Sequence, residues 1–263
     1  FISVTGADEA IAEVRLSRPE KKNALTLDML DALVAAGREL ASKSGLRAVI
    51  LWGEGGDFSA GLDTGALMAM AGKLDAIKQE MLCPPKGANA NRFQLPAIIW
   101  SQLHVPVIAV LEGVCFGGGA QIALGADFRI ARPDTRFSIM EGKWGLIPDM
   151  GISQSLPALV PADRAKELIM TARVITGAEA HSYGLVTRLS DAPLHEARAF
   201  AECLVGRSPD AIRSGKALVD AIYAGKPAEH LRLEAVLQAD LMGAPNQVET
   251  IMANMQKRSP VYR

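Results

Sequence analysis

The chain has 263 residues, of which 49% are hydrophobic and 22% are charged, and its 28 basic and 29 acidic side chains give a net charge of −1. This composition excludes a disordered or collagen-like chain, and the charge balance gives no general attraction to nucleic acid or to an anionic membrane. No apolar run approaches the roughly 18–20 residues that span a membrane. Three widely spaced cysteines without a C-x-x-C pair, Cys83, Cys115 and Cys203, favour a reducing cytoplasm over a disulfide framework.

The first part of the chain alternates between strand and helix patterns. Apolar runs at 11–16 and 48–52 predict buried strands, and leucines at helical spacing between residues 25 and 40 predict a helix. From 64 to 91 the sequence becomes rich in methionine and ends in a Gly-Ala-Asn-Ala-Asn run. Because methionine adapts to irregular apolar shapes, this stretch is interpreted as the lining of a pocket for a flexible apolar ligand or as a loosely packed helix with its loop.

Two more units of the same kind follow. The run 106–111 predicts a strand, 113–119 a turn and the residues from 120 onward a helix. Strands are predicted again at 127–131 and 136–139, and a loop at 141–151 leads to a helix from Ile152. Successive units of this kind predict an α/β fold with a spiral, solenoid-like winding.

Strand patterns stop beyond about residue 208. Three amphipathic helices are predicted at 209–223, 228–241 and 248–257, with Ala, Leu and Met on one face. We therefore divide the chain into a core at 1–205 and a helical C-terminal segment at 206–263. Helices attached to a larger body in this way often pack on that body or on another subunit.

Two glycine-rich loops have the composition to present backbone N–H groups to a ligand. The turn 115–121 lies between a predicted strand and the start of a helix, which leaves N–H groups free at the positive end of the helix dipole. The loop 55–63 also follows a predicted strand. Paired N–H donors stabilise an oxyanion. The alternative is that the glycines serve close packing and turns with positive φ.

Several short segments occur in a distinctive order along nearly the whole chain. They are Arg18–Leu25, Phe58–Asp63, Pro106–Gly113 with Gly117–Gly119, Ala126–Ala131, Phe137–Gly151 and Lys257–Pro260. In this order and spacing they resemble the crotonase (enoyl-CoA hydratase/isomerase) superfamily. The resemblance implies a crotonase-type spiral of β-β-α units with a C-terminal helical trimerisation segment, so that a homotrimer or hexamer is expected. It also implies an acyl-CoA thioester substrate, which carries its own coenzyme A, and no metal or redox cofactor.

The resemblance also implies site residues. In this superfamily two backbone N–H groups hold the thioester oxygen, and they correspond here to Leu62 and Gly118. The coenzyme A contacts correspond to Lys22, Ala24, Ala60 and Gly61, with Lys257 as a basic residue that could reach a phosphate. For the basic pair Lys21–Lys22 a solvated surface pair is the alternative interpretation.

Three polar side chains decide which reaction is expected. Hydratases of this family carry two glutamates, and the corresponding positions here are Gln121 and Glu141. Because glutamine cannot exchange a proton at neutral pH, the usual addition of water by two carboxylates lacks one partner. Glu141 is the candidate acid/base, with a surface glutamate at a strand end as the alternative. Asp149 matches an acidic residue of the dienoyl-CoA isomerase branch, which has an aspartate in place of Gln121; the alternative is that Asp149 caps the helix from Ile152.

The leading hypothesis is an acyl-CoA enzyme that removes and returns a proton next to the thioester. Leu62 and Gly118 would stabilise the enolate, and isomerisation of a double bond is favoured. Two alternatives stay open: an enoyl-CoA hydratase in which Gln121 positions water, and a non-catalytic acyl-CoA-binding subunit. The four scattered histidines lack metal spacing, and no G-x-S-x-G motif supports a serine hydrolase.

Overall fold

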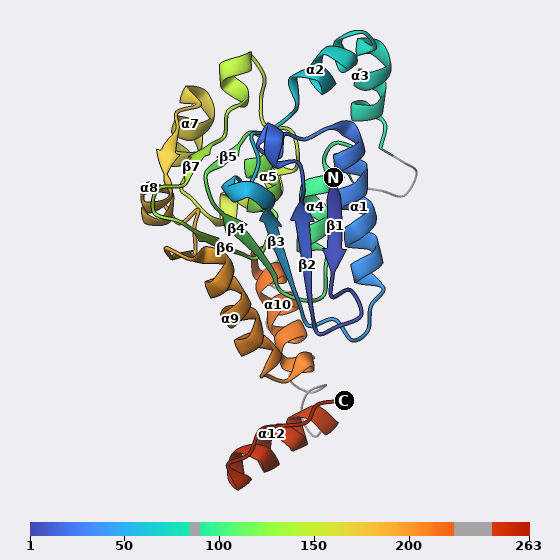
Figure 1. Ribbon diagram of the computed structural model, residues 1–263, viewed down its shortest axis with the longest axis vertical. Coiled ribbons are helices and arrows are strands. Elements are labelled where there is room, and N and C mark those ends of the chain that lie inside the picture. The colour runs from blue at the N-terminus through green and yellow to red at the C-terminus, as the bar shows by residue number, and fades with distance from the viewer. Residues whose placement is uncertain (85–89, 224–243) are drawn as a thin grey trace.

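The computed structural model describes residues 1–84, 90–223 and 244–263, arranged around two β-sheets (Figure 1). The large sheet has the strand order β1-β2-β3-β4-β6-β9, and the small sheet has the order β5-β7-β8. In the large sheet β1 is antiparallel to β2, and the other neighbours are parallel. The strands of the large sheet are β1 (Ile2–Thr5), β2 (Ile11–Leu16), β3 (Ala48–Gly53), β4 (Val107–Leu111), β6 (Phe128–Ala131) and β9 (Arg188–Leu189), and those of the small sheet are β5 (Val114–Phe116), β7 (Arg136–Ser138) and β8 (Ile175–Thr176).

Helices cover the sheets and form the C-terminal part. The α-helices are α1 (Leu27–Ala41), α2 (Thr64–Ala71), α3 (Leu74–Leu82), α4 (Leu95–Ser101), α5 (Gly118–Leu124), α6 (Ile152–Ser155), α7 (Ala162–Thr171), α8 (Gly177–Ser182), α9 (Pro193–Val205), α10 (Pro209–Tyr223) and α12 (Pro245–Gln256). Short 3-10 helices are η1 (Pro19–Lys21), η2 (Glu54–Gly56), η3 (Glu141–Trp144) and η4 (Leu156–Ala158).

The chain passes from the large sheet to the small sheet in successive turns. β4 is followed by β5 and then by α5, and β6 is followed by β7. After β3, Ser59 forms a parallel bridge with Cys115 of β5, so the first turn also reaches the small sheet. This alternation agrees with the predicted spiral winding and with the β-β-α units that the family resemblance implies, whereas trimerisation through the C-terminal segment stays a prediction.

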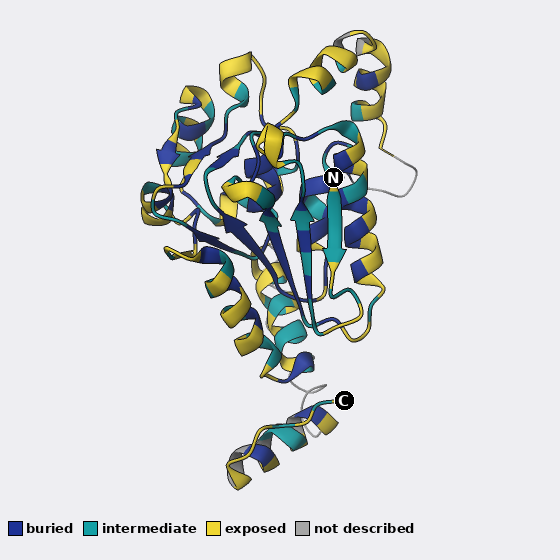
Figure 2. Cartoon of the chain, in the orientation of Figure 1, coloured by how far each residue is buried: buried dark blue, intermediate teal, exposed yellow. Residues whose placement is uncertain are grey.

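The central strands of the large sheet bury both faces, which explains why they are continuous apolar runs in the sequence. In β3, Val49 and Leu51 belong to the main core together with residues of α1 and α4. Ala48 and Ile50 belong to a second cluster, which contains Ala197 of α9. Neighbouring residues of a strand point to opposite faces, so the two sets pack against different helices. Figure 2 shows these strands in dark blue, with exposed residues on the outer surfaces of the helices.

Most of the predicted elements are confirmed with shifted ends. The helix predicted at 25–40 begins at Leu27, because the Thr26 hydroxyl caps it by accepting a hydrogen bond from the Met29 N–H at 3.2 Å. The prediction of a plain turn at 113–119 is wrong, since Val114–Phe116 forms β5 and pairs with β7. The short elements β1, α4 and everything from α7 to α9 are additions that the sequence patterns did not predict.

The methionine-rich stretch that begins at residue 64 contains two short helices, α2 and α3, instead of one. α2 begins where the Asp63 carboxylate accepts hydrogen bonds from the N–H groups of Gly65 and Ala66 at 2.8 and 3.2 Å. This capping explains why the helix starts directly after the glycine-rich loop.

The C-terminal segment is joined to the core by a largely buried ion pair. Lys216 of α10 binds the carboxylate of Asp127, which also accepts a hydrogen bond from the Val107 N–H at 2.8 Å. α10 has the bounds predicted for it, and α12 begins at Pro245, three residues before the predicted start. The helix predicted at 228–241 lies outside the described residues. Within the described ranges, no helix is both long and apolar enough to cross a membrane.

Candidate active site

A buried asparagine organises the loop that follows β3. Asn23 is fully buried and has a φ of 52°, in the left-handed region. Its side-chain amide donates to the carbonyl groups of Glu54 and Asp57 at 2.9 and 2.7 Å, and its oxygen accepts from the Arg18 N–H at 2.8 Å. The two amide bonds fasten the turn at 18–24 to the loop at 54–63, and the third closes the turn itself.

Four of the residues expected to contact coenzyme A lie together where the turn at 18–24 meets the loop at 54–63. The Ala60 N–H donates to the Lys22 carbonyl at 2.9 Å, and the Leu25 N–H donates to the Gly61 carbonyl at 2.8 Å. Ala24, directly before Leu25, is half-buried. The Lys22 side chain is exposed, and its ammonium group lies 3.1 Å from the Asp57 carboxylate. The structure therefore brings Lys22, Ala24, Ala60 and Gly61 together and leaves a cationic group beside them.

Leu62 forms a parallel bridge with Leu25, and the N–H group of Leu62 points away from Leu25. Leu25 uses its own N–H and carbonyl to bond the flanking Gly61 carbonyl and Asp63 N–H, both at 2.8 Å. In a parallel bridge this pattern turns the Leu62 N–H to the opposite side. Within the described part of the chain this N–H has no protein acceptor. The end of β5 is close by, because a Cβ on Gly61 would lie 2.9 Å from the Phe116 carbonyl oxygen.

A second free N–H group belongs to Gly118. Gly117 has a φ of 52° and turns the chain from β5 into α5, which begins at Gly118. The first N–H groups of a helix lack intrahelical acceptors, and the Gly118 N–H has no other acceptor among the described residues. A Cβ at Gly118 would lie 2.8 Å from the Met150 sulfur and 3.4 Å from Leu25 Cδ1. Leu62 and Gly118 thus both lie against Leu25.

Gln121 links the two segments that carry the acidic side chains. It is 2% exposed, its Nε2 donates to Glu141 Oε1 at 2.6 Å, and its Oε1 accepts from the Met150 N–H at 2.8 Å. The second oxygen of Glu141, Oε2, is buried and has no hydrogen-bond partner among the described residues. A Cβ on Gly117 would lie 3.4 Å from Glu141 Oε1, which places this carboxylate beside the start of α5.

The surroundings favour the protonated forms of both acids. Burial is the main cause that raises the pKa of Glu141, and the negative charge of Asp149 raises it further, whereas the hydrogen bond from Gln121 lowers it. The alternative of a surface glutamate at 141 is wrong, because Glu141 is only partly exposed and its Oε2 is buried. Asp149 is exposed as a residue, yet the protein around its carboxyl group removes enough water to raise its pKa. The alternative of a helix cap is wrong for Asp149, because α6 has Gly151 at its N-cap and no capping side chain.

Lys257 is not brought to this site within one chain. It follows α12, whose first turn is tied to α10 by a hydrogen bond of 2.9 Å between Asn246 and Asp210. The C-terminal tail then packs near the start of β3, where Arg47 lies 5.7 Å from the ring centre of Tyr262. The site loops follow the other ends of the parallel strands, and Figure 1 shows α12 at the opposite end of the molecule. The expected contact of Lys257 with a phosphate is therefore not available in a single chain.

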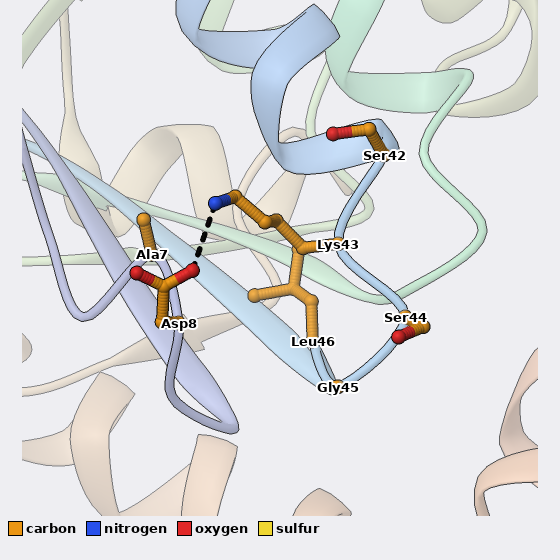
Figure 3. A pocket seen from close by; sticks show the side chains of 7 residues that line it. All are labelled: Ala7, Asp8, Ser42, Lys43, Ser44, Gly45 and Leu46. Atoms are coloured by element: carbon orange, nitrogen blue, oxygen red, sulfur yellow. Dashed lines mark hydrogen bonds and ion pairs between the residues drawn. The ribbon is translucent and has the colours of Figure 1, made fainter.

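A surface depression of about 270 Å³ lies away from the candidate site (Figure 3). It is lined by Ala7, Asp8 and the stretch Ser42–Leu46, and Lys43 bridges it with an ion pair of 2.8 Å to Asp8. Because these residues precede β2 and β3, the depression is at the amino ends of the parallel strands. In the described ranges no group of three or more His, Cys, Asp or Glu side chains is arranged to hold a metal ion.

The whole chain matches one protein family. A family model described as enoyl-CoA hydratase/isomerase matches residues 6–263. The chain belongs to the enoyl-CoA hydratase/isomerase family. It is 31% identical over 274 residues to the mitochondrial Δ(3,5)-Δ(2,4)-dienoyl-CoA isomerase of Mus musculus, which covers 98% of this chain and 80% of that protein. It is 30% identical over 268 residues to the mitochondrial enoyl-CoA hydratase domain-containing protein 2 of Homo sapiens, with 99% and 88% covered. The crystal structure of an enoyl-CoA hydratase from Polaromonas sp. JS666 matches with a TM-score of 0.88 at 29% identity and covers 100% of this chain and 99% of that one.

Membership of the enoyl-CoA hydratase/isomerase family establishes an enzyme and leaves the reaction open. The relatives just described carry both isomerase and hydratase names at nearly equal identity.

Sequence reasoning missed three residues that shape the site of this enoyl-CoA hydratase/isomerase family member. Arg18 donates to the Ala24 carbonyl at 3.0 Å and to the Asp63 carboxylate at 2.7 Å, and Asn23 fastens the two loops. Both lie in the segment that carries the family resemblance, which is the signal that could have found them. The Met150 N–H bonds to Gln121 across 29 residues of chain, and no local pattern signals such a contact.

Proposed function

We propose that this enzyme binds an acyl-CoA thioester, forms its enolate and moves a proton at the carbon next to the thioester. The favoured reaction is isomerisation of the double bond of an enoyl-CoA. One observation carries the proposal: Glu141 Oε2 is buried without a hydrogen-bond partner in the described structure, and the other oxygen of this carboxylate lies beside Gly117, which precedes the Gly118 N–H group. Such an arrangement suits a group that exchanges a proton with a substrate instead of stabilising the fold.

In the proposed reaction the N–H groups of Leu62 and Gly118 form the oxyanion hole. Glu141 removes a proton from the α carbon, the electrons of the C–H bond form the enolate, and negative charge develops on the thioester oxygen. Each N–H donor to that oxygen is worth about 3–4 kcal/mol of barrier in a dry site. Return of the proton to the γ carbon shifts the double bond by one position, with no atom gained or lost. The raised pKa of Glu141 brings it nearer to neutrality, where a general acid/base works best. Asp149 would serve as a second acid or orient water.

The two ends of the substrate have separate candidate surfaces. We propose that the coenzyme A part lies along Lys22, Ala24, Ala60 and Gly61. The acyl group would lie along α2, which begins directly after the Leu62 loop and has Leu67 and Met68 39% and 76% exposed. Burial of such side chains under an acyl group is favourable by roughly 25 cal/mol per Å² of apolar surface.

Assembly and cellular location are part of the same proposal. Because Lys257 lies at the opposite end of the chain, its phosphate contact would come from another subunit of a homotrimer or hexamer. We propose a cytoplasmic enzyme on the strength of three free cysteines, and a reaction that uses no metal and no cofactor besides the coenzyme A of the substrate.

Hydration is the second candidate reaction. The structural relative from Polaromonas sp. JS666 is named an enoyl-CoA hydratase. In this candidate Gln121 would position water, and Glu141 or Asp149 would deliver the proton. A rate of water addition to a short 2-enoyl-CoA that rises in Gln121→Glu would favour this candidate. An unchanged rate would show that Gln121 does not limit hydration.

Deuterium exchange tests the proposal. The protein is incubated in D₂O with saturated, 2-enoyl and 3-enoyl CoA esters, and exchange at the α and γ carbons is followed by mass spectrometry. Exchange and double-bond migration are expected for the wild type and for Glu202→Gln, a matched change at an exposed glutamate on α9. Both should be lost in Glu141→Gln while binding of the CoA ester persists. Full activity of Glu141→Gln would contradict the proposal, and tight binding without exchange by the wild type would favour the non-catalytic subunit.

A further inference from the structure

We infer that Gln121 is a positioning residue that holds Glu141 by one carboxylate oxygen and leaves the other oxygen, Oε2, as the atom that exchanges the proton. The inference rests on the proposed role of Glu141 as acid/base. It assigns a function to the position at which this chain departs from the two-glutamate pattern. Gln121 then positions the acid/base, instead of merely marking the absence of the glutamate that hydratases carry at this position.

The hydrogen-bond partners of Gln121 allow one orientation of its amide. Glu141 Oε1 is an acceptor when ionised, so it must face the NH₂ group, and the Met150 N–H is a donor, so it must face the amide oxygen. Turning the amide around would set a donor against a donor at Met150. Because Gln121 is 2% exposed, water cannot easily replace either partner. The amide is therefore locked from both ends.

This lock distinguishes the two oxygens of Glu141. Oε1 lies 2.6 Å from the Gln121 amide nitrogen, and its lone pair there is occupied. Oε2 is buried and has no partner in the part of the chain that the structure describes. A free lone pair in a dry site is more available to a substrate C–H than one already bound to a donor.

The same side chain also sets the position of the second acid. Asp149 immediately precedes Met150, whose N–H is held by the Gln121 oxygen at 2.8 Å. A movement of Gln121 would therefore shift the separation of the two carboxyl groups, and Asp149 raises the pKa of Glu141 through its charge. α7, which packs against η3, carries Glu167, and this carboxylate pairs with Arg164 of the same helix and with Arg173.

A glutamate at position 121 would not reproduce this arrangement. It could accept from the Met150 N–H, but an ionised carboxylate has no hydrogen to donate to Glu141. Two carboxylates at such a separation cannot both be ionised, so they would share one proton and titrate as a pair. Gln121→Glu is therefore expected to perturb the acid/base rather than add a second independent one.

The test compares Gln121→Met with Gln154→Met. The first removes both hydrogen bonds at nearly constant volume, and the second makes the same change at an exposed glutamine of α6. The first readout is steady-state kinetics with the CoA ester that the wild type turns over. The second is a ¹³C NMR titration of the Glu141 carboxyl carbon in the free protein, whose signal is assigned by its disappearance in Glu141→Gln. If Gln121→Met does not fold, Gln121→Asn, which keeps the amide and is too short to reach both partners, takes its place.

In Gln121→Met we expect kcat to fall about 10-fold to 100-fold with little change in KM, the range for a misplaced catalytic group. The Glu141 carboxyl should titrate at higher pH, because a hydrogen bond to the charged form is lost. Gln154→Met should match the wild type in both readouts. An unchanged kcat together with an unchanged Glu141 titration would overturn the inference while leaving the proposed function intact. A different result would separate the two ideas. If the wild type turns over no ester but the Glu141 titration still shifts in Gln121→Met, the proposed function is rejected and the coupling between Gln121 and Glu141 is kept.

Discussion

Replacing Gly61 by alanine tests whether the loop after β3 must approach the end of β5 as closely as it does. Gly61 has a φ of 88°, and a Cβ there would lie 2.9 Å from the Phe116 carbonyl oxygen. Gly56 on the same loop is the matched control, because its φ is 81° and a Cβ there would meet nothing within 4 Å. Both substitutions strain the backbone, and only Gly61→Ala also forces two chain segments apart.

The geometry gives the size of the expected effects. A left-handed conformation costs a side-chain-bearing residue about 1–2 kcal/mol, which should appear as a loss of stability in both variants. In Gly61→Ala the new carbon falls about 0.5 Å short of an ordinary contact distance, so the Phe116 carbonyl or the Leu62 loop must move. Overpacking of this kind costs about 1–3 kcal/mol more. Since Leu62 follows Gly61 directly, its N–H moves relative to Gly118, and kcat should fall about 10-fold to 100-fold.

Urea denaturation and steady-state kinetics with the same CoA ester measure these effects. Gly56→Ala should lose stability and keep its kcat, while Gly61→Ala should lose more stability and most of its kcat. Equal kcat values in the two variants would refute the reasoning, because they would show that the spacing of the Leu62 and Gly118 N–H groups does not limit the reaction.

Three further outcomes follow from buried groups. Asn23→Ala leaves three polar partners unpaired, at about 1–3 kcal/mol each, and should lower the free energy of unfolding in urea by several kcal/mol; a loss below about 1 kcal/mol would contradict its organising role. Folding raises the pKa of Glu141, so the folded state holds this proton more tightly and its ionisation lowers stability as pH rises above the usual glutamate range. Glu141→Gln should therefore be more stable than wild type at pH 8, and this advantage should disappear at acidic pH in the same denaturation assay. Cys115 is fully buried, and burial raises the pKa of its thiol, so iodoacetamide should modify Cys83 and Cys203 in the native protein and reach Cys115 only after unfolding.

The sequence predicts the central strands well because their burial leaves a clear pattern. β3 and β4 are covered on both faces, and a run of apolar residues is the direct result of that burial. β5 is lost in the glycine-rich turn because three residues are too few to show a period of two. α7 buries a single residue, Leu168, so its stripe toward the core is too narrow to stand out in the sequence.

Some residues of the candidate site could likewise be predicted from the sequence, and others could not. The positions of Leu62, Gly118 and Glu141 follow from local motifs, because each lies in a segment whose order along the chain resembles the family. The bond from Gln121 to the Met150 N–H and the pairing of Asn23 with the loop at 54–57 depend on how distant turns stack. Lys257 shows the opposite case, since its family position suggests a role that the fold of one chain cannot supply.

The stacking of successive turns also separates the tasks of the site along the chain. The first turn carries Leu62, the second carries Gly118 and Gln121, and the third carries Glu141 and Asp149. Under the proposed function, a substitution at Glu141 in the third turn would therefore alter proton transfer while the Leu62 N–H in the first turn stays in place.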